Sequence, residues 1–285
     1  MKKTVLDFNE MKRKGEKITY LTAYDYPIGS LCEKAGLDMI LVGDSAGMIV
    51  YGYKGTNPVT MDQMISHSQI VRRGAPDTFI VGDMPFLSYQ LSVENAIYNA
   101  GRFYKEAEVD AIKLEGGQRV IDKIKGIVDA GMSVMGHIGL TPQSSGQVGG
   151  FKAQGRTAET AIGLVNDALA IEKVGAFALL VEAIPPEVGK IITETLKIPV
   201  LGIGGGMYTD GQVLIVGDML GLFEAFTPKF VKKYTNLSEI IEKAFREYIE
   251  DVKTVKFPEE KHCYRMIEGE QEKLEALLKK RPLSK

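Results

Sequence analysis

The chain has 285 residues, 45% of them hydrophobic, which suits one large α/β barrel or two domains of about 140 residues. A formal net charge of −2 provides no basic field for nucleic acid or an anionic membrane surface, so neither is an expected partner. The two cysteines, Cys32 and Cys263, lack the spacing of a disulfide framework or a zinc site, which suits a reducing cytoplasm.

At the N-terminus, Lys2 and Lys3 are not followed by the apolar segment that a secretory signal requires. Nowhere does the chain hold the ~20 uncharged, mostly apolar residues of a membrane helix. We therefore expect a soluble cytoplasmic protein. The first predicted helix covers residues 6–14.

Apolar runs then alternate with longer amphipathic runs, which is typical of parallel βαβ units. The predicted strands are short runs rich in apolar or β-branched residues and bounded by Gly, Asp or Pro: 18–25, 39–44, 78–83, 111–115, 133–138, 177–183 and 198–203. A weaker candidate for an eighth strand lies near residues 220–226.

Two of the intervening segments have clear helical spacing. Apolar residues recur on one face over 93–107 and again over 156–174, where Gly175 supplies a helix stop. Pro27 and Pro186 fall where a helix is expected to begin, which suits their fixed φ and missing amide hydrogen. We interpret these segments as crossover helices that follow short loops.

Parallel strands that are apolar along most of their length must be covered on both faces, which leaves a doubly wound sheet or a closed barrel. A Rossmann-type sheet requires a glycine fingerprint directly after the first strand, and residues 22–26 lack one. We therefore predict an α/β fold of the (β/α)₈ TIM-barrel type. The barrel domain is expected over residues 1–263, with the helix at 6–14 plugging its bottom, and a charged helical tail over 264–285.

In such a barrel the active site lies at the carboxyl ends of the strands. Consecutive predicted strands each end with an ionisable residue, namely Asp44, Asp83, Glu115, His137 and Glu182. Any one of the acidic residues could serve only as the N-cap of the next helix. Together, carboxylates on neighbouring strands would repel one another in a poorly solvated barrel mouth unless a cation lay between them.

The first three acids offer hard oxygen ligands, which favours Mg²⁺ over Zn²⁺ or Cu²⁺. Because magnesium keeps several waters, Asp44 and Asp83 are expected to bind it directly, and Glu115 directly or through water. Lys113 shares a strand face with Glu115, so it would either pair with that residue or meet a substrate carboxylate. Ser45 could donate to the same carboxylate.

Glu182 lies alone in an apolar stretch, where burial would raise its pKa toward the range of a general base for carbon acids. It could equally cap the next helix or bind an arginine such as Arg156. His137 could be a hydrogen-bonded core histidine, but its position at a strand end favours a role in the site. The glycine run at 202–206 is compatible with a phosphate-binding loop, a close backbone passage or a tight turn.

Ordered sequence blocks run over roughly residues 4–262: 18–25, 41–45, 58–60, 71–76, 83–86, 113–117, 136–143, 149–156 and 202–206. Together these blocks resemble the ketopantoate hydroxymethyltransferases, a family of the phosphoenolpyruvate/pyruvate barrel superfamily. Three departures fall outside the candidate site residues: Gly205 where the family often has Ala, Ala153 where it usually has Val, and a longer tail.

The resemblance implies an enzyme of pantothenate and coenzyme A biosynthesis. Its reaction would transfer a hydroxymethyl group from 5,10-methylenetetrahydrofolate to 3-methyl-2-oxobutanoate, giving 2-dehydropantoate through a magnesium-stabilised enolate. The expected partners are therefore a 2-oxo acid and a folate, with Mg²⁺ as cofactor. The resemblance also implies a large homo-oligomer, a decamer.

The residue roles that the resemblance implies agree with those argued above. Asp44 and Asp83 would bind magnesium, with Glu115 as a third ligand, and both aspartates would also contact the substrate. Ser45 and Lys113 would hold the 2-oxo acid. The residues at the reacting carbon would be the proton acceptor Glu182 and, near it, His137.

Two other functions compete with this one. A carbon–carbon lyase or phosphonomutase of the same superfamily would use the same magnesium enolate chemistry without folate. Those relatives usually carry a Cys-bearing catalytic loop, which Cys32 and Cys263 fit badly. A barrel that binds a metabolite without catalysis would have no turnover for a Glu182→Gln substitution to remove.

Overall fold

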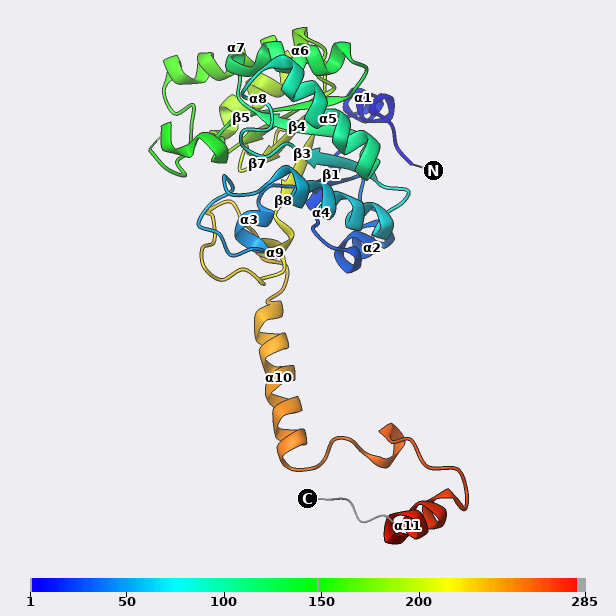
Figure 1. The fold of residues 1–285 in the computed structure, drawn as a ribbon. Helices are drawn as coiled ribbons and strands as arrows, with labels where there is room; N and C mark the ends of the chain where they lie inside the picture. Colours follow the sequence, from blue (N-terminus) through cyan, green and yellow to red (C-terminus); the bar gives the residue numbers. More distant parts are fainter. Residues whose placement is uncertain (1, 148, 281–285) are drawn as a thin grey trace. The chain divides into compact units, whose positions relative to one another are not determined.

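The computed structural model describes residues 2–147 and 149–280, and in them a closed barrel of eight parallel strands in chain order (Figure 1). The strands are β1 (Ile18–Thr22), β2 (Met39–Val42), β3 (Phe79–Asp83), β4 (Ala111–Glu115), β5 (Val134–Gly139), β6 (Ala178–Glu182), β7 (Val200–Ile203) and β8 (Gly211–Leu214). Since β8 pairs with β1, the sheet closes on itself, which confirms the predicted barrel and excludes the doubly wound sheet.

Most of the helices in this part of the chain cover the outside of the barrel, as parallel strands require. They are α1 (Val5–Lys14), α2 (Tyr26–Lys34), α3 (Ala46–Ile49), α4 (Met61–Gly74), α5 (Val93–Ala107), α6 (Ile121–Asp129), α7 (Ala158–Lys173), α8 (Pro186–Thr195) and α9 (Val216–Met219), with 3₁₀ turns η1 (Gln118–Val120) and η2 (Pro142–Gln147). The bounds of α5 are those predicted. It begins where the Ser92 side chain accepts a hydrogen bond from the amide of Asn95, and it buries the face that carries Ala96, Ala100 and Phe103.

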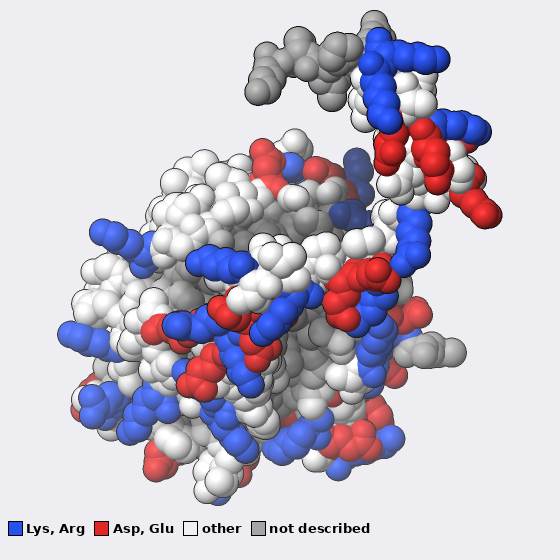
Figure 2. All heavy atoms as spheres, turned by 90° about the horizontal axis from the view of Figure 1, so that it is seen from below, with Lys and Arg blue, Asp and Glu red and all other residues white. Residues whose placement is uncertain are grey.

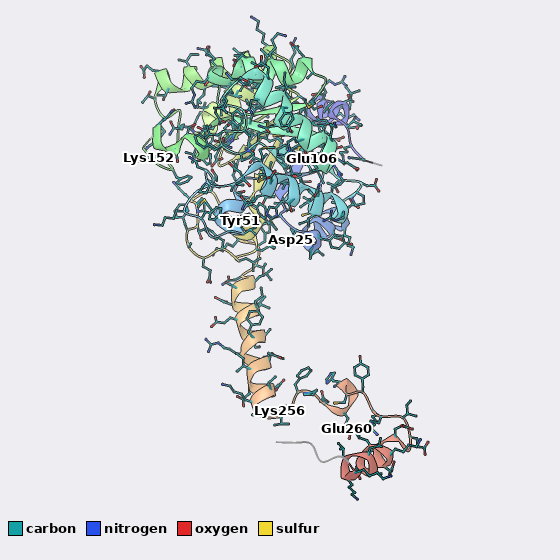
Figure 3. All side chains as sticks on the ribbon, viewed as in Figure 1. Asp25, Tyr51, Glu106, Lys152, Lys256 and Glu260 are labelled. Carbon is teal, nitrogen blue, oxygen red and sulfur yellow. The ribbon has the colours of Figure 1, made fainter. Side chains whose placement is uncertain are left out.

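The first predicted strand ends three residues early, and the residues after it start a helix. Asp25, labelled in Figure 3, is the N-cap of α2, and its carboxylate accepts a hydrogen bond from the amide of Ile28 at 2.8 Å. Pro27 lies in the first turn of α2, and Pro186 is the first residue of α8, as their missing amide hydrogens led us to expect.

The eighth strand was predicted in the wrong place. It is Gly211–Leu214, whereas residues 220–226 form a turn and irregular chain after α9. The true strand is short, begins with a glycine and a glutamine, and therefore lacks an apolar run. Gly211 is required because a side chain there would collide with the backbone oxygen of Ile18 on β1. Barrel closure, a long-range constraint, fixes this strand.

Helix α1 plugs the amino-terminal end of the barrel, as predicted. Phe8 is fully buried, and its ring meets that of Phe79, at the start of β3, edge-on with centroids 5.0 Å apart. Phe79 in turn contacts Phe177, next to the start of β6, at 5.7 Å. Burying a phenylalanine side chain contributes about 1.5–3 kcal/mol, so this contact anchors the helix and leaves the opposite end of the barrel open for a site.

Residues after Thr235 form a separate compact unit. It contains α10 (Leu237–Lys253), the 3₁₀ turn η3 (Glu260–His262) and α11 (Glu270–Lys280). One face of α10 carries the apolar residues Ile241, Phe245, Tyr248 and Val252, and none of the helix's side chains is buried. Helix α11 agrees with the predicted helical tail, of which residues 281–285 lie outside the described part of the chain.

The surface seen in Figure 2 carries Lys and Arg side chains interspersed with Asp and Glu. This mixture agrees with the formal net charge of −2 and offers no broad basic face in that view. None of the described helices is long and apolar enough to cross a membrane.

Candidate active site

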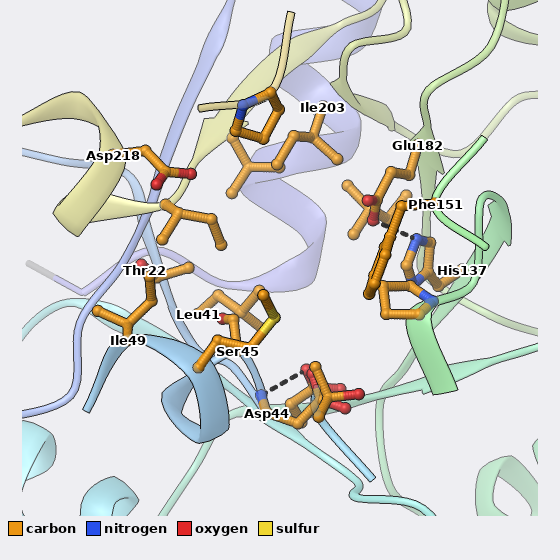
Figure 4. A pocket seen from close by; sticks show the side chains of 18 of the residues that line it. Thr22, Leu41, Asp44, Ser45, Ile49, His137, Phe151, Glu182, Ile203 and Asp218 are labelled. Carbon is orange, nitrogen blue, oxygen red and sulfur yellow. Dashed lines mark hydrogen bonds and ion pairs between the residues drawn. The ribbon is translucent and has the colours of Figure 1, made fainter. Parts of the chain in front are cut away.

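The ionisable residues predicted at the strand ends come together in one pocket at the carboxyl end of the barrel (Figure 4). Strand register explains part of this arrangement, because Asp83 is paired with Lys113, and Glu115 with His137, across neighbouring strands. The residues that line the pocket include every candidate named from the sequence: Asp44, Ser45, Asp83, Lys113, Glu115, His137 and Glu182.

A cluster of acidic residues around one lysine forms the floor of the pocket. The backbone amide of Asp44 donates to Asp83 Oδ2 at 3.0 Å, so the two aspartates are adjacent. Lys113 Nζ lies 2.8 Å from Asp83 Oδ1 and 3.9 Å from Glu115 Oε1. The nearer partner of Lys113 is therefore Asp83, not the Glu115 that its spacing in the sequence suggested.

The four charged side chains of this cluster are almost completely buried, and burial dominates their pKa values. Burial raises the pKa of Asp83 to about 7 and that of Glu115 to about 7, although the Lys113 charge opposes both shifts. Burial and the Glu115 charge also raise the pKa of Asp44. For Lys113, the attraction of the three carboxylates outweighs burial and raises its pKa. With all four ionised, the cluster carries an excess of negative charge.

These residues fit a hard divalent cation. Asp83 Oδ1 is buried, and it meets Lys113 Nζ as an ion pair without accepting a directed hydrogen bond from any described residue. Crowded carboxylate oxygens with an excess of negative charge are the ligands that Mg²⁺ prefers. Within the described residues no three His, Cys, Asp or Glu side chains form a ready-made metal-binding group.

Two residues that the sequence did not single out hold the acidic cluster in place. Gln143 Nε2 donates to Asp44 Oδ2 and to the carbonyl oxygen of Met84, both at 2.9 Å, and its backbone amide donates to Glu115 Oε2 at 3.0 Å. The Tyr89 hydroxyl donates to Gln143 Oε1 at 2.7 Å and accepts from the amide of Glu115 at 3.1 Å. Gln143 is the last residue of the sequence block 136–143 named above. A glutamine outside a strand has no sequence pattern that would mark it as a site residue.

Glu182 and His137 form a second group on another wall of the pocket (Figure 4). His137 Nε2 lies 3.2 Å from Glu182 Oε2, although the ring is not turned for a well-aligned hydrogen bond. His137 Nδ1 lies 3.4 Å from Lys113 Nζ, which is a donor, so Nε2 carries the hydrogen in the neutral ring. Glu182 therefore pairs with His137 and not with Arg156, the alternative partner considered from the sequence.

In a simple ion pair the pKa of the histidine rises and the pKa of the carboxyl group falls. Here each pKa shifts the other way. Burial lowers the pKa of His137, and the nearby Lys113 charge lowers it further, so the ring stays neutral. Burial raises the pKa of Glu182, an effect that the contact with His137 partly offsets. A buried carboxylate with a raised pKa beside a neutral histidine is suited to accept a proton from a carbon acid.

Ser45 lies between the acidic cluster and the outer pocket. Its hydroxyl is 2.7 Å from the hydroxyl of Tyr24, which is buried. Ser45 is partly exposed and lines the pocket, so its side chain is available to a ligand. Tyr24 was not predicted as a site residue, because it follows the first strand without an ionisable character at neutral pH.

The rest of the pocket is mostly apolar, with one further carboxylate. Asp218 on α9 was not predicted, because the misplaced eighth strand hid the fact that it lies shortly after the end of β8. In the glycine run, a Cβ at Gly204 would collide with Phe230 and one at Gly206 with Pro186. Both glycines have positive φ, so this run is explained by close packing and a tight turn.

A (β/α)₈ barrel with these buried side chains at the carboxyl ends of its strands is an enzyme fold with a site for a small molecule. Solved structures share the fold. One is phosphonopyruvate hydrolase, which matches with a TM-score of 0.60 at 13% identity over 99% of this chain and 100% of that one. Another is 2,3-dimethylmalate lyase of the PEP mutase/isocitrate lyase superfamily, with a TM-score of 0.59 at 14% identity over 98% and 99% of the two chains.

Sequence comparison narrows the class. The profile of the ketopantoate hydroxymethyltransferase family matches residues 2–260. Relatives named 3-methyl-2-oxobutanoate hydroxymethyltransferase are 58% identical in Alkaliphilus metalliredigens, over 95% of this chain and 96% of that one, and 51% identical in Moorella thermoacetica, over 92% and 97%. The chain belongs to the ketopantoate hydroxymethyltransferase family and is an enzyme of the hydroxymethyltransferase type.

Proposed function

We propose that this enzyme transfers a hydroxymethyl group from 5,10-methylenetetrahydrofolate to 3-methyl-2-oxobutanoate, in pantothenate and coenzyme A biosynthesis. One water supplies the hydroxyl oxygen, so the products are 2-dehydropantoate and tetrahydrofolate. Family membership supports the transferase activity. The observation that carries the mechanism is the buried Glu182 carboxylate beside neutral His137, in the same pocket as the Asp44, Asp83 and Lys113 cluster.

The acidic cluster is the proposed binding site for the 2-oxo acid. Magnesium held by Asp44 and Asp83, with Glu115 acting through water, would supply positive charge next to the keto oxygen and so acidify the C3 proton. Lys113 and the Ser45 hydroxyl would hold the substrate carboxylate. A barrel of the same fold, phosphonopyruvate hydrolase, has been solved with oxalate and Mg²⁺.

Glu182 is the proposed base. Its carboxylate takes the proton from C3, and the electrons of the C3–H bond move into the C2–C3 bond. His137 keeps the carboxylate oriented and ionised from 3.2 Å, and the apolar neighbours exclude water that would compete for it. Water hydrolyses the methylene bridge of the folate, so both folate nitrogens leave and the one-carbon unit reaches the oxidation level of formaldehyde. The nucleophilic C3 then bonds to that carbon, and its oxygen takes up a proton to become the new hydroxyl.

The test of this function is folate-dependent product formation. Purified protein with Mg²⁺, 3-methyl-2-oxobutanoate and 5,10-methylenetetrahydrofolate should produce 2-dehydropantoate, which mass spectrometry detects. No product should form when the folate is omitted. Cleavage of a 2-oxo acid without folate would instead identify a lyase, and the absence of any turnover would leave a binding protein.

We also propose a large homo-oligomer, a decamer, in the cytoplasm, with the barrel domain over residues 1–263 and an extension over 264–285. The exposed apolar face of α10, which carries Ile241, Phe245 and Tyr248, supports self-association because such a face is unfavourable in water. Light scattering of the purified protein measures the number of subunits. A monomer in solution would contradict the proposal.

A further inference from the structure

One buried carboxylate in the pocket has no part in the chemistry described so far. Asp218 is 5% exposed, and Figure 4 shows its carboxylate facing the pocket from α9. Within the described residues, no hydrogen bond or ion pair reaches this carboxylate. Burial raises its pKa to about 6, and the charge of Lys233 only partly opposes that shift. The carboxylate faces the open space of the pocket without a protein donor, so a ligand with N–H donors is the natural complement.

The surroundings of Asp218 indicate the shape of that ligand. Ile49 lies near Asp218 in Figure 4, and the pocket's other lining side chains are largely apolar and include Ile215 and Phe223. A largely apolar wall with one carboxylate selects a flat, mainly apolar ring that bears donors along one edge. A carboxylate accepts two parallel N–H groups well when they are adjacent and coplanar.

The 2-oxo acid is not that ligand. It is an anion, and the negative charge of Asp218 would repel it. In Figure 4, Asp218 lies on the opposite side of the pocket from Glu182 and His137. A ring held by Asp218 would therefore extend toward the residues that activate the carbon nucleophile, as the one-carbon donor must.

The pocket also continues into a neighbouring hollow beyond Glu182. Phe226 and Phe230 line both spaces, and the neighbouring one is also lined by Arg156 and Lys229. Both cations are exposed, and neither is in an ion pair within the described residues. Two exposed cations at this end of the pocket suit carboxylates at the far end of a long ligand.

We propose that Asp218 is the residue that recognises the one-carbon donor, by accepting the N3–H and 2-amino hydrogens of its 2-amino-4-oxopteridine ring. The p-aminobenzoyl and glutamate portions then lie toward Arg156 and Lys229. This inference rests on the proposed folate-dependent function, and it adds the orientation of the folate and the residue that selects it.

The experiment compares the wild type with Asp218→Asn, which keeps the size of the side chain but replaces one acceptor with a donor. The KM for 5,10-methylenetetrahydrofolate should rise about 10- to 100-fold, because a charged hydrogen-bond partner is lost. Exchange of the C3 proton of 3-methyl-2-oxobutanoate without folate should be unchanged. The matched control is Asp129→Asn, at an exposed carboxylate on α6, which should leave both values unchanged.

Two fragments of the folate test the orientation. Calorimetry should show that Asp218→Asn weakens binding of 6-methyltetrahydropterin but not of p-aminobenzoylglutamate, and that Arg156→Gln with Lys229→Gln does the reverse. A wild-type measurement adds a check that needs no variant: a pterin without the 2-amino group should bind about 10-fold or more weakly than its parent.

The possible failures are distinguishable. An unchanged folate KM and unchanged pterin binding in Asp218→Asn, with normal turnover by the wild type, overturns the role of Asp218 and leaves the proposed function intact. Loss of folate-free exchange in Asp218→Asn also overturns it, since Asp218 would then support the acidic cluster or the fold. A wild type that exchanges C3 but forms no product with folate overturns the proposed function itself.

Discussion

His137 Nε2 lies 3.2 Å from Glu182 Oε2, and both side chains are buried at the carboxyl end of the barrel. The two residues come from the neighbouring strands β5 and β6, whose register sets Gly139 opposite Glu182 and so places His137 below it. Because burial and Lys113 keep the histidine neutral, it orients the carboxylate without neutralising it. This arrangement supports the proposed role of Glu182 as the base.

The pH dependence of C3 exchange tests this arrangement. Glu182 must be ionised to accept a proton, and burial raises its pKa above the ordinary value of 4.5. The exchange rate should therefore fall as the pH falls through an ionisation above 4.5. In His137→Leu the pH at which the exchange rate falls should be higher, because the contact that lowers the pKa of Glu182 is removed while Lys113 and Glu115 still face the site. An unchanged midpoint pH in that variant would contradict the proposed pairing.

Metal removal should abolish activity and leave the fold intact. Treatment with a chelator should stop C3 exchange, and Mg²⁺ should restore it, because the cation supplies several kcal/mol of charge stabilisation. Asp83→Asn should lower both the Mg²⁺ affinity, measured by calorimetry, and the exchange rate, each by at least about 100-fold. Unchanged Mg²⁺ affinity in Asp83→Asn would remove Asp83 from the ligand set.

Gln143 is predicted to position the acidic cluster without reacting. Gln143→Leu removes the donors to Asp44 Oδ2 and Met84 O, so Mg²⁺ affinity should fall about 10- to 100-fold. Tyr89→Phe removes only the hydroxyl that orients Gln143, and its effect should be smaller. The positioning role predicts that excess Mg²⁺ restores much of the exchange rate of Gln143→Leu. A rate that stays low at saturating Mg²⁺ would instead indicate direct participation.

The plug helix contributes to stability and not to chemistry. Phe8→Ala should lower the free energy of unfolding by about 3–5 kcal/mol, because a fully buried ring is replaced by a cavity beneath the barrel. The matched control on the same helix is Leu6→Ala, at a residue that is 73% exposed, with an expected effect within about 0.5 kcal/mol. Urea denaturation measures both values, and similar losses in the two variants would show that the plug contact is not specific.

Much of the barrel could be predicted from the sequence because most strands are buried on both faces and read as apolar runs. The predicted run at 111–115, for example, has the bounds of β4. β8 escaped prediction because its position depends on pairing with Ile18 and its neighbours on β1, almost two hundred residues away in the chain. Local sequence carries little information about such closure.

The candidate site likewise contains some residues that the sequence could indicate and others that it could not. That five of its residues share one pocket could be predicted because a charged residue at the end of an apolar strand is conspicuous: Asp44, Asp83, Glu115, His137 and Glu182. The supporting residues were missed because glutamine and tyrosine in loops have no distinctive pattern, and only the folded chain brings them to the carboxylates: Gln143 and Tyr89. The nearer partner of Lys113 could not be predicted from the sequence either. Spacing along the strand favoured Glu115, whereas the register between β3 and β4 places Asp83 beside Lys113.

The most direct measurement is hydrogen–deuterium exchange at C3 of 3-methyl-2-oxobutanoate, followed by NMR in deuterated water with Mg²⁺ and no folate. The wild type should exchange this proton, and Glu182→Gln, which keeps the size of the side chain but removes the base, should not. Exchange at the wild-type rate in Glu182→Gln would contradict the assignment of Glu182 as the proton acceptor.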